Sequence, residues 1–219
     1  MVADGFKRRT PSRWGEGGAL RDEILAAAAR LLTESGREGD LSLRAVAREV
    51  GISAPSIYLH FADRAELVAT VTQRAYERLA TELREAREGE AANGPRAGLQ
   101  AMTRRYCQLA LDNPKLYRLM FGIERTLRSR EEMASHPLFL VSQVWLEAVA
   151  ACRGGGGEGR DEKRAGDMEG EGRDDQRVAW LLWFSLHGVV AMAMSTPFET
   201  DRHAMQEMAD DLLKLALAG

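Results

Sequence analysis

Hydrophobic residues recur every three or four positions over most of this 219-residue chain, which is the spacing of helices with one buried face. The first stripe lies within residues 20–36 and consists of Ile24, Leu25, Ala28, Leu31 and Leu32. The second consists of Leu43, Val46, Ala47 and Val50. Gly36 and Gly51 follow these stripes, and glycine is a typical residue at the C-terminal stop of a helix. Both helices are therefore predicted to end there.

A third, shorter helix is predicted to begin at Ala54. Ser53 is expected to cap it through its side chain, and Pro55 falls in its first turn, where a missing N–H costs little. Two helices joined by so short a turn form a helix-turn-helix, a motif whose second helix can enter the major groove of DNA.

The rest of the chain also predicts helices, because Ala, Leu, Glu and Arg dominate and runs of β-branched residues are absent. The expected ranges are 63–88, 96–112, 114–122, 137–151, 176–195 and 201–217. The helix at 63–88 would join the helix-turn-helix to the part of the chain after Pro95. The fold class is therefore predicted as all-α, with one domain at 20–80 and a second at 81–219.

Residues 153–175 interrupt this pattern with eight glycines among mostly charged residues, so a flexible external loop is expected there. Gly154 to Gly159 has the glycine spacing of a phosphate loop. Arg160 and Asp161 follow it in place of the Lys and the Ser or Thr that bind phosphate and magnesium, so a nucleotide site is rejected.

Residues 178–198 contain no charged side chain, and this length would also suit a membrane span. Ser185, His187, Gly188 and Pro197 argue against insertion, and the flanking charges give no orientation signal. A helix that is apolar on nearly every side also fits the centre of a homodimer, with one face against its own protomer and another against the partner. The homodimer without a membrane is the favoured interpretation.

Charge changes the picture only slightly. The formal net charge is −3, and residues 1–69 contain ten basic and ten acidic residues, unlike a general polyanion binder. Residues 1–19 are expected to form a flexible arm, whose basic cluster is Lys7, Arg8, Arg9 and Arg13. This arm could follow a phosphate backbone or serve only as a solvated tail.

Several classes of site are not predicted. The four histidines are too scattered to suggest a metal site, and no catalytic constellation or cofactor motif is present, so the chain is not expected to be an enzyme. The N-terminus lacks the apolar core of a signal peptide, and Cys107 and Cys152 show no paired spacing. These features favour a reducing, cytoplasmic location.

Residues 20–70 resemble the DNA-binding domain of TetR family transcriptional regulators. The resemblance rests on the first helix and on the run from Gly51 to Phe61, GISAPSIYLHF, followed by Asp63, Arg64, Glu66 and Leu67. Asp63 and Glu66 also have the spacing of a capping box at the start of the next helix.

The chemistry of these residues agrees with contacts to DNA. Tyr58 and His60 can donate to phosphate oxygens, and a cation such as Arg64 near a helix start is better explained by a phosphate than by the helix dipole. By resemblance, Ser42 and His60 are expected at the DNA backbone and Arg44 and Ser56 at base edges. The full set of candidate DNA-binding residues is Ser42, Arg44, Ser53, Ala54, Pro55, Ser56, Tyr58, His60 and Arg64.

Alternatives remain open at several of these positions. Tyr58 and Phe61 could be core aromatics, which is the expectation for Phe61 and leaves it outside the candidate set. Arg44 could be a solvated charge. Ala54 is small where a longer donor could have read a base, so direct readout is expected to be thin and DNA shape to contribute.

The C-terminal half is similar, more weakly, to the ligand-sensing domains of a TetR subgroup that carries a Trp-His-Gly triplet. This chain has Leu186, His187 and Gly188, with Trp183 one turn earlier. Such domains hold a small molecule and dimerise through their last two helices. Candidate ligand-binding residues are Tyr106, Met120, Phe121, Trp145, Trp183 and His187.

The resemblance implies a homodimeric transcriptional regulator, a repressor that leaves a palindromic double-stranded DNA operator when a small-molecule effector binds. The alternative is a helical small-molecule-binding or interaction module that does not bind DNA.

Overall fold

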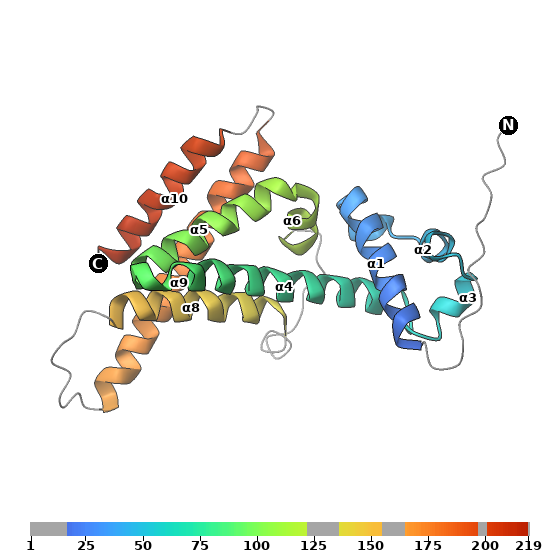
Figure 1. Cartoon of the computed structure of the whole chain (residues 1–219), viewed down its shortest axis with the longest axis horizontal. Coiled ribbons are helices and arrows are strands. Elements are labelled where there is room, and N and C mark those ends of the chain that lie inside the picture. Colours follow the sequence, from blue (N-terminus) through green and yellow to red (C-terminus); the bar gives the residue numbers. More distant parts are fainter. Residues whose placement is uncertain (1–16, 122–135, 155–164, 197–200, 219) are drawn as a thin grey trace. The chain divides into compact units, whose positions relative to one another are not determined.

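The computed structural model describes residues 17–121, 136–154, 165–196 and 201–218 (Figure 1). Every regular element in these ranges is a helix, so the all-α prediction is confirmed. The chain divides into two compact units. The first comprises Met1–Ala75 and Lys115–Arg125, and the second comprises Tyr76–Pro114 and Thr126–Gly219.

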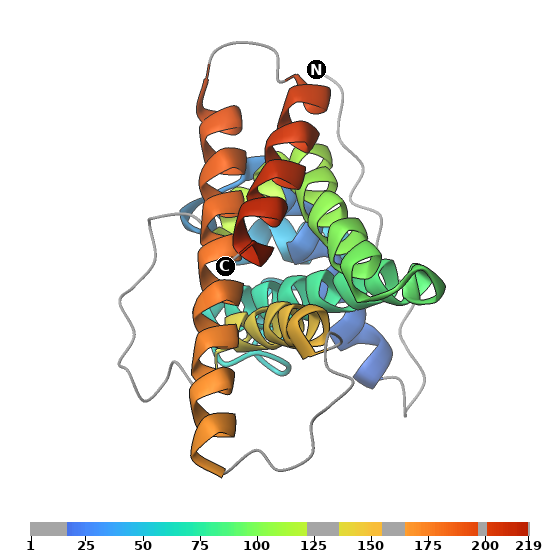
Figure 2. The same ribbon diagram turned by 90° about the vertical axis from the view of Figure 1, so that its left-hand side faces the viewer.

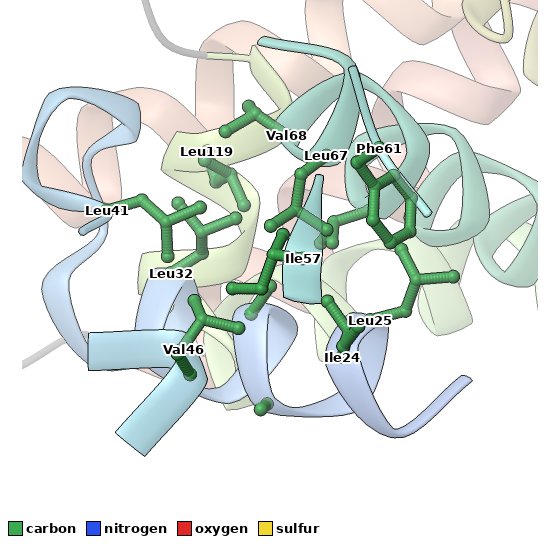
Figure 3. Packing of buried hydrophobic residues seen from close by; sticks show 14 residues of the cluster. Ile24, Leu25, Leu32, Leu41, Val46, Ile57, Phe61, Leu67, Val68 and Leu119 are labelled. Carbon is green, nitrogen blue, oxygen red and sulfur yellow. The ribbon is translucent and has the colours of Figure 1, made fainter. Parts of the chain in front are cut away.

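The first unit is built around one buried cluster of aliphatic side chains and Phe61. Its elements are α1 (Gly17–Ser35), the 3₁₀ turn η1 (Glu38–Asp40), α2 (Leu43–Val50), α3 (Ala54–Ile57), the first part of α4 (Arg64–Gly89), and α6 (Pro114–Phe121). Figure 3 shows Ile57 between side chains of α1, α2 and α4. The predicted stripes of α1 and α2 supply much of this core.

The predicted stop of the first helix is confirmed. Gly36 has φ +71°, and its N–H donates to the Leu32 carbonyl at 2.8 Å. This bond satisfies a carbonyl that the helix end would otherwise leave unpaired.

Helix α6 belongs to the first unit although the sequence placed it in the second domain. Leu119 on α6 is 3% exposed and packs in the core of the first unit (Figure 3). Lys115 Nζ donates to the Glu34 carbonyl at the end of α1. The units also divide within α4, between Ala75 and Tyr76. The boundary expected at residue 80 therefore differs from the compact units, because hydrophobic burial joins segments that are distant in sequence.

The second unit contains the rest of α4, the 3₁₀ turn η2 (Ala91–Asn93), α5 (Pro95–Asp112), α8 (Leu138–Gly154), α9 (Ala165–Ser195) and α10 (Arg202–Leu217). Helices α8 and α10 each pack on α9, and α5 packs on α8, α9 and α10 (Figure 2). Gln100 and Arg104 on α5 donate to the two carboxylate oxygens of Asp210 on α10, at 2.9 and 2.8 Å. Burial raises the pKa of Asp210, but these hydrogen bonds outweigh it and hold the pKa below its usual value.

The expectation of a flexible loop over residues 153–175 is wrong at both ends. Arg153 and Gly154 lie in α8, and residues 165–175 form the start of α9. Arg153 pairs with Asp174 and Asp175, which ties the end of α8 to α9. Residues 155–164 lie outside the described residues, as do Lys7, Arg8, Arg9 and Arg13 of the predicted arm.

Candidate functional site

The helix-turn-helix begins with α2 and its stop at Gly51. Gly51 has φ +79°, and the N–H groups of Gly51 and Ile52 both donate to the Ala47 carbonyl at 2.9 Å. This left-handed backbone favours glycine. Ser53 then leads into α3 with an extended backbone, so the predicted turn and the start of the second helix at Ala54 are confirmed.

The predicted side-chain cap at Ser53 is wrong. Its Oγ lies 2.7 Å from Oγ of Ser56, and no backbone N–H donates to it. The Ser56 N–H donates instead to the Ser53 carbonyl at 2.9 Å. The neighbouring hydroxyl competes with the backbone for this side chain. Two hydroxyls of the recognition tip, residues 53–61, therefore use part of their hydrogen-bonding capacity on each other.

None of the nine candidate DNA-binding residues is buried. Ala54, Ser56 and His60 are half-buried, and the exposed residues are Ser42, Arg44, Ser53, Pro55, Tyr58 and Arg64. A core position for Tyr58 is excluded, because the residue is 58% exposed. Phe61 is 1% exposed and lies in the core, as expected. Their individual contacts with DNA stay predictions.

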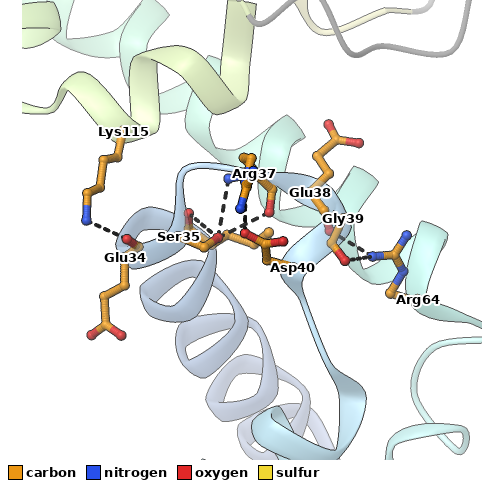
Figure 4. Close-up of polar contacts among 9 residues, drawn as sticks. Glu34, Ser35, Arg37, Glu38, Gly39, Asp40, Arg64 and Lys115 are labelled. Carbon is orange, nitrogen blue, oxygen red and sulfur yellow. Dashed lines mark hydrogen bonds and ion pairs between the residues drawn. The ribbon is translucent and has the colours of Figure 1, made fainter.

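Arg64 has a partner within the protein. Its guanidinium Nη1 donates to the carbonyls of Glu38 and Gly39 at 2.8 and 3.1 Å (Figure 4). These carbonyls belong to η1, so Arg64 fixes the connection between α1 and α2 to the start of α4. These carbonyls give the cation a partner within the protein, so a phosphate is not needed to explain its position, and its contact with DNA stays a prediction. Its neighbour Asp63 caps α4 as predicted, since Asp63 Oδ1 accepts from the Glu66 N–H at 2.8 Å and Glu66 accepts from the Ala62 N–H.

The same connection is held from its other end by α6. Lys115 Nζ donates to the Glu34 carbonyl (Figure 4). A Cβ placed on Gly36 would lie 3.4 Å from the Lys115 Cβ. Lys115 was not among the candidate residues. A lone lysine after a helix-starting proline gives no sequence signal for a contact with a carbonyl 81 positions earlier.

Another residue missed by the sequence is Leu59. It is 84% exposed and lies between Tyr58 and His60 in the recognition tip. A leucine in a helical segment is normally assigned to the core, so its type gave no reason to place it at the surface.

In the second unit, three of the candidate ligand-binding residues come together from three helices. Tyr106 Oη on α5 lies 3.4 Å from His187 Nδ1 on α9, and the ring of Tyr106 meets Trp145 of α8 edge-on, with centroids 5.8 Å apart. Tyr106 and Trp145 are buried. Trp183 is also buried, one turn before His187 on α9.

This cluster carries two polar features. The Nε1–H of Trp145 is buried and has no hydrogen-bond partner among the described residues. Burying a donor without an acceptor costs about 1–3 kcal/mol. Burial lowers the pKa of His187, so its imidazole is neutral at neutral pH. The cluster therefore presents an unpaired N–H and an uncharged imidazole in apolar surroundings.

The remaining candidates, Met120 and Phe121, lie on α6 in the first unit. Met120 is buried, and the Phe121 ring packs on Tyr117 at a centroid distance of 4.8 Å. The structure therefore does not bring the six candidates together in one compact unit. They were grouped with the others as apolar residues of the C-terminal half, whereas α6 packs in the core of the first unit.

Helix α9 has a buried face and an exposed apolar face. The helix Gly172–Ser195 is long and apolar enough to cross a membrane, with a mean hydropathy of 1.6 over its most apolar 18 residues. The exposed large hydrophobic residues of α9 are Trp180, Leu181, Phe184 and Met192. On the adjacent α10 they are Met208 and Leu215. Among the described residues, no three His, Cys, Asp or Glu side chains are grouped as metal ligands.

Comparison with known families agrees with this architecture. A model described as bacterial regulatory proteins of the tetR family matches residues 24–71. A second, described as the C-terminal domain of tetracyclin repressor-like proteins, matches residues 99–216. The chain belongs to the TetR family. The resemblance recognised in residues 20–70 and in the C-terminal half is thus confirmed. A search of curated proteins found no match.

Solved structures share the fold of this chain. A protein of unknown function from Rhodococcus sp. RHA1 is 25% identical, with a TM-score of 0.69 over 93% of this chain and 98% of that one. A putative TetR-family regulator from Mesorhizobium loti MAFF303099 has 18% identity and a TM-score of 0.67 over 92% and 96%. The fatty acid degradation regulator FadR from Bacillus halodurans has 15% identity and a TM-score of 0.65 over 90% and 98%. The latter two show a shared fold.

TetR-family proteins are DNA-binding transcriptional regulators and are generally not enzymes. The present chain has both parts of that architecture, the helix-turn-helix and the helical C-terminal domain.

Proposed function

We propose that this TetR-family protein is a cytoplasmic repressor that binds a palindromic operator as a homodimer and leaves it when a small effector binds. The observation that carries the proposal is the recognition tip, where Ile57 and Phe61 are buried while the candidate residues Ser53, Pro55 and Tyr58 are exposed. A helix that enters a groove needs one side fixed in the protein core and the other side exposed to the DNA.

Dimerisation is supported by the exposed apolar face of α9 and α10. Soluble proteins rarely expose several neighbouring large hydrophobic side chains unless another surface covers them. An α9–α10 pair that packs on its partner's pair gives a four-helix bundle with twofold symmetry. Such a dimer would present two recognition tips to half-sites about 34–36 Å apart, or a multiple of that distance.

Effector binding is supported by the polar features of the second unit. A ligand oxygen that accepts from Trp145 Nε1–H would remove the cost of burying that donor. Tyr106 is part of the same cluster and lies on α5, which is followed by Asn113 and then α6. Because α6 contributes Leu119 to the core of the first unit, a shift of α5 would act on the helix-turn-helix through the chain itself.

A gel-shift assay with DNA from upstream of the protein's own gene tests the proposal. The wild-type dimer should shift one fragment. Leu212→Glu, on the apolar side of α10, should give monomers that fail to shift it. The matched control Lys214→Glu adds the same carboxylate on the exposed polar side and should retain dimerisation and binding.

Light scattering on the same samples separates the possible results. A dimer that shifts no DNA would favour a small-molecule-binding module without DNA binding. A monomeric Leu212→Glu with undiminished operator affinity would contradict the proposed dimer arrangement.

A further inference from the structure

The recognition tip carries an apolar ridge that the candidate DNA contacts do not explain. Among the described residues, Leu59 is the most exposed large hydrophobic, at 84%. The helical turn continues past α3, since Phe61 N–H donates to the Ile57 carbonyl at 3.0 Å and Tyr58 N–H to that of Pro55 at 3.2 Å. Pro55 and Leu59 are four positions apart and both exposed, so they lie on the same side of this turn.

This ridge lies opposite the buried side of the same turn. Ile57 and Phe61 are fixed in the core of the first unit and set the direction in which Leu59 points. Leu59 adds nothing to that core. A leucine held outward beside Tyr58 and His60 therefore has a partner outside the protein, or none.

The partner of the ridge must itself be apolar, which excludes the phosphate backbone. The major groove offers one apolar group, the C5-methyl of thymine, and small hydrophobic side chains contact it in other readers of the groove. The polar alternatives at the tip are few. The side chain of Ala54 carries no hydrogen-bond donor, and the hydroxyls of Ser53 and Ser56 hydrogen-bond to each other at 2.7 Å.

We infer that Leu59, with Pro55 beside it, contacts a thymine methyl in each operator half-site and thereby selects the base pair at that position. The inference rests on the proposed operator binding and adds a residue that determines its specificity. Loss of one buried methyl corresponds to roughly a fourfold loss of affinity per half-site, or about fifteenfold for the two half-sites of a dimer.

The test uses the full-length dimer and an operator selected from a random duplex pool. The thymines of that operator are replaced by uracil one position at a time, symmetrically in both half-sites. Each replacement removes only the methyl group. Dissociation constants are measured by fluorescence anisotropy for the wild type, for Leu59→Ala and for His60→Ala. Because Leu59 is exposed, Leu59→Ala should retain the thermal midpoint and helical content of the wild type.

The expected result is one position at which uracil weakens the wild type about fifteenfold. Leu59→Ala should bind the thymine and uracil operators equally well. His60→Ala should bind both more weakly while keeping the difference between them, because a phosphate contact is blind to the base.

If every uracil penalty persists in Leu59→Ala, or if no thymine shows one, the inference is wrong although the operator binding stands. If the pool yields no preferred duplex, operator binding itself fails. Wild-type affinity of Leu59→Ala for the operator would also overturn the contact and leave the ridge available to a protein partner.

Discussion

Leu119→Ala tests whether α6 is part of the helix-turn-helix unit. Leu119 is 3% exposed in a cluster with side chains of α1, α2 and α4. Replacing a fully packed leucine by alanine removes three carbon atoms and leaves a cavity, at a cost of roughly 2–5 kcal/mol. That is a large share of a stability of roughly 5–15 kcal/mol. Arg118→Ala, at an exposed position on the same helix, should change stability by less than about 0.5 kcal/mol.

Native-state hydrogen exchange gives the location of the effect as well as its size. A loss of about 3 kcal/mol lowers the protection of the most stable amides of α1 and α2 by roughly a hundredfold. Operator affinity at 37 °C should fall together with the stability of α1 and α2. Helix α6 is not part of the helix-turn-helix unit if Leu119→Ala destabilises α1 and α2 no more than Arg118→Ala does, or if only α5, α8 and α9 lose protection.

Three further predictions concern the second unit. Gly98→Ala should destabilise the chain by about 1–3 kcal/mol in urea unfolding, because its Cβ would lie 3.0 Å from the Arg87 carbonyl oxygen, whereas Gly172→Ala, in open space on α9, should be neutral or stabilising. Burial lowers the pKa of His187 below 6.5, so near and below that pH the unfolded chain binds more protons than the folded one. The free energy of unfolding should therefore fall as pH drops below about 6.5, and it should fall less steeply in His187→Gln. Burial also raises the pKa of the Cys107 thiol to about 11. In a Cys152→Ala background, a thiol reagent should therefore label Cys107 only as fast as the protein opens. Rapid labelling of the native protein would contradict this burial.

Local patterns allowed most of the helices to be predicted. The stripes of α1 and α2, the glycine stops at Gly36 and Gly51 and the capping residue Asp63 act within a few positions, so sequence spacing is sufficient to reveal them. Family membership followed from the same segment. At the recognition tip the burial of Phe61 was predicted, whereas the exposure of Leu59 was not, because a leucine in a helical segment is normally assigned to the core.

Long-range contacts were not predictable in this way. Nothing near Arg64 or Leu119 indicates that the first binds the carbonyls of η1 or that the second joins the core of α1 and α2. The start of α9 was missed because glycine lowers helix propensity. The ion pairs of Asp174 and Asp175 in α9 with Arg153 in α8 favour this helix, and they are contacts between two helices that the local sequence does not reveal. Ser53 failed as a cap because a second hydroxyl was one turn away.

The most direct test of the central claim is the ratio of affinities for two duplexes of equal length and composition, at about 150 mM salt. One is an operator selected by the wild-type dimer, and the other is its scrambled sequence. A sequence-reading dimer should prefer the operator by at least about a thousandfold, with two protomers bound per palindrome. Equal affinities, or binding with one protomer per site at full strength, would contradict the account.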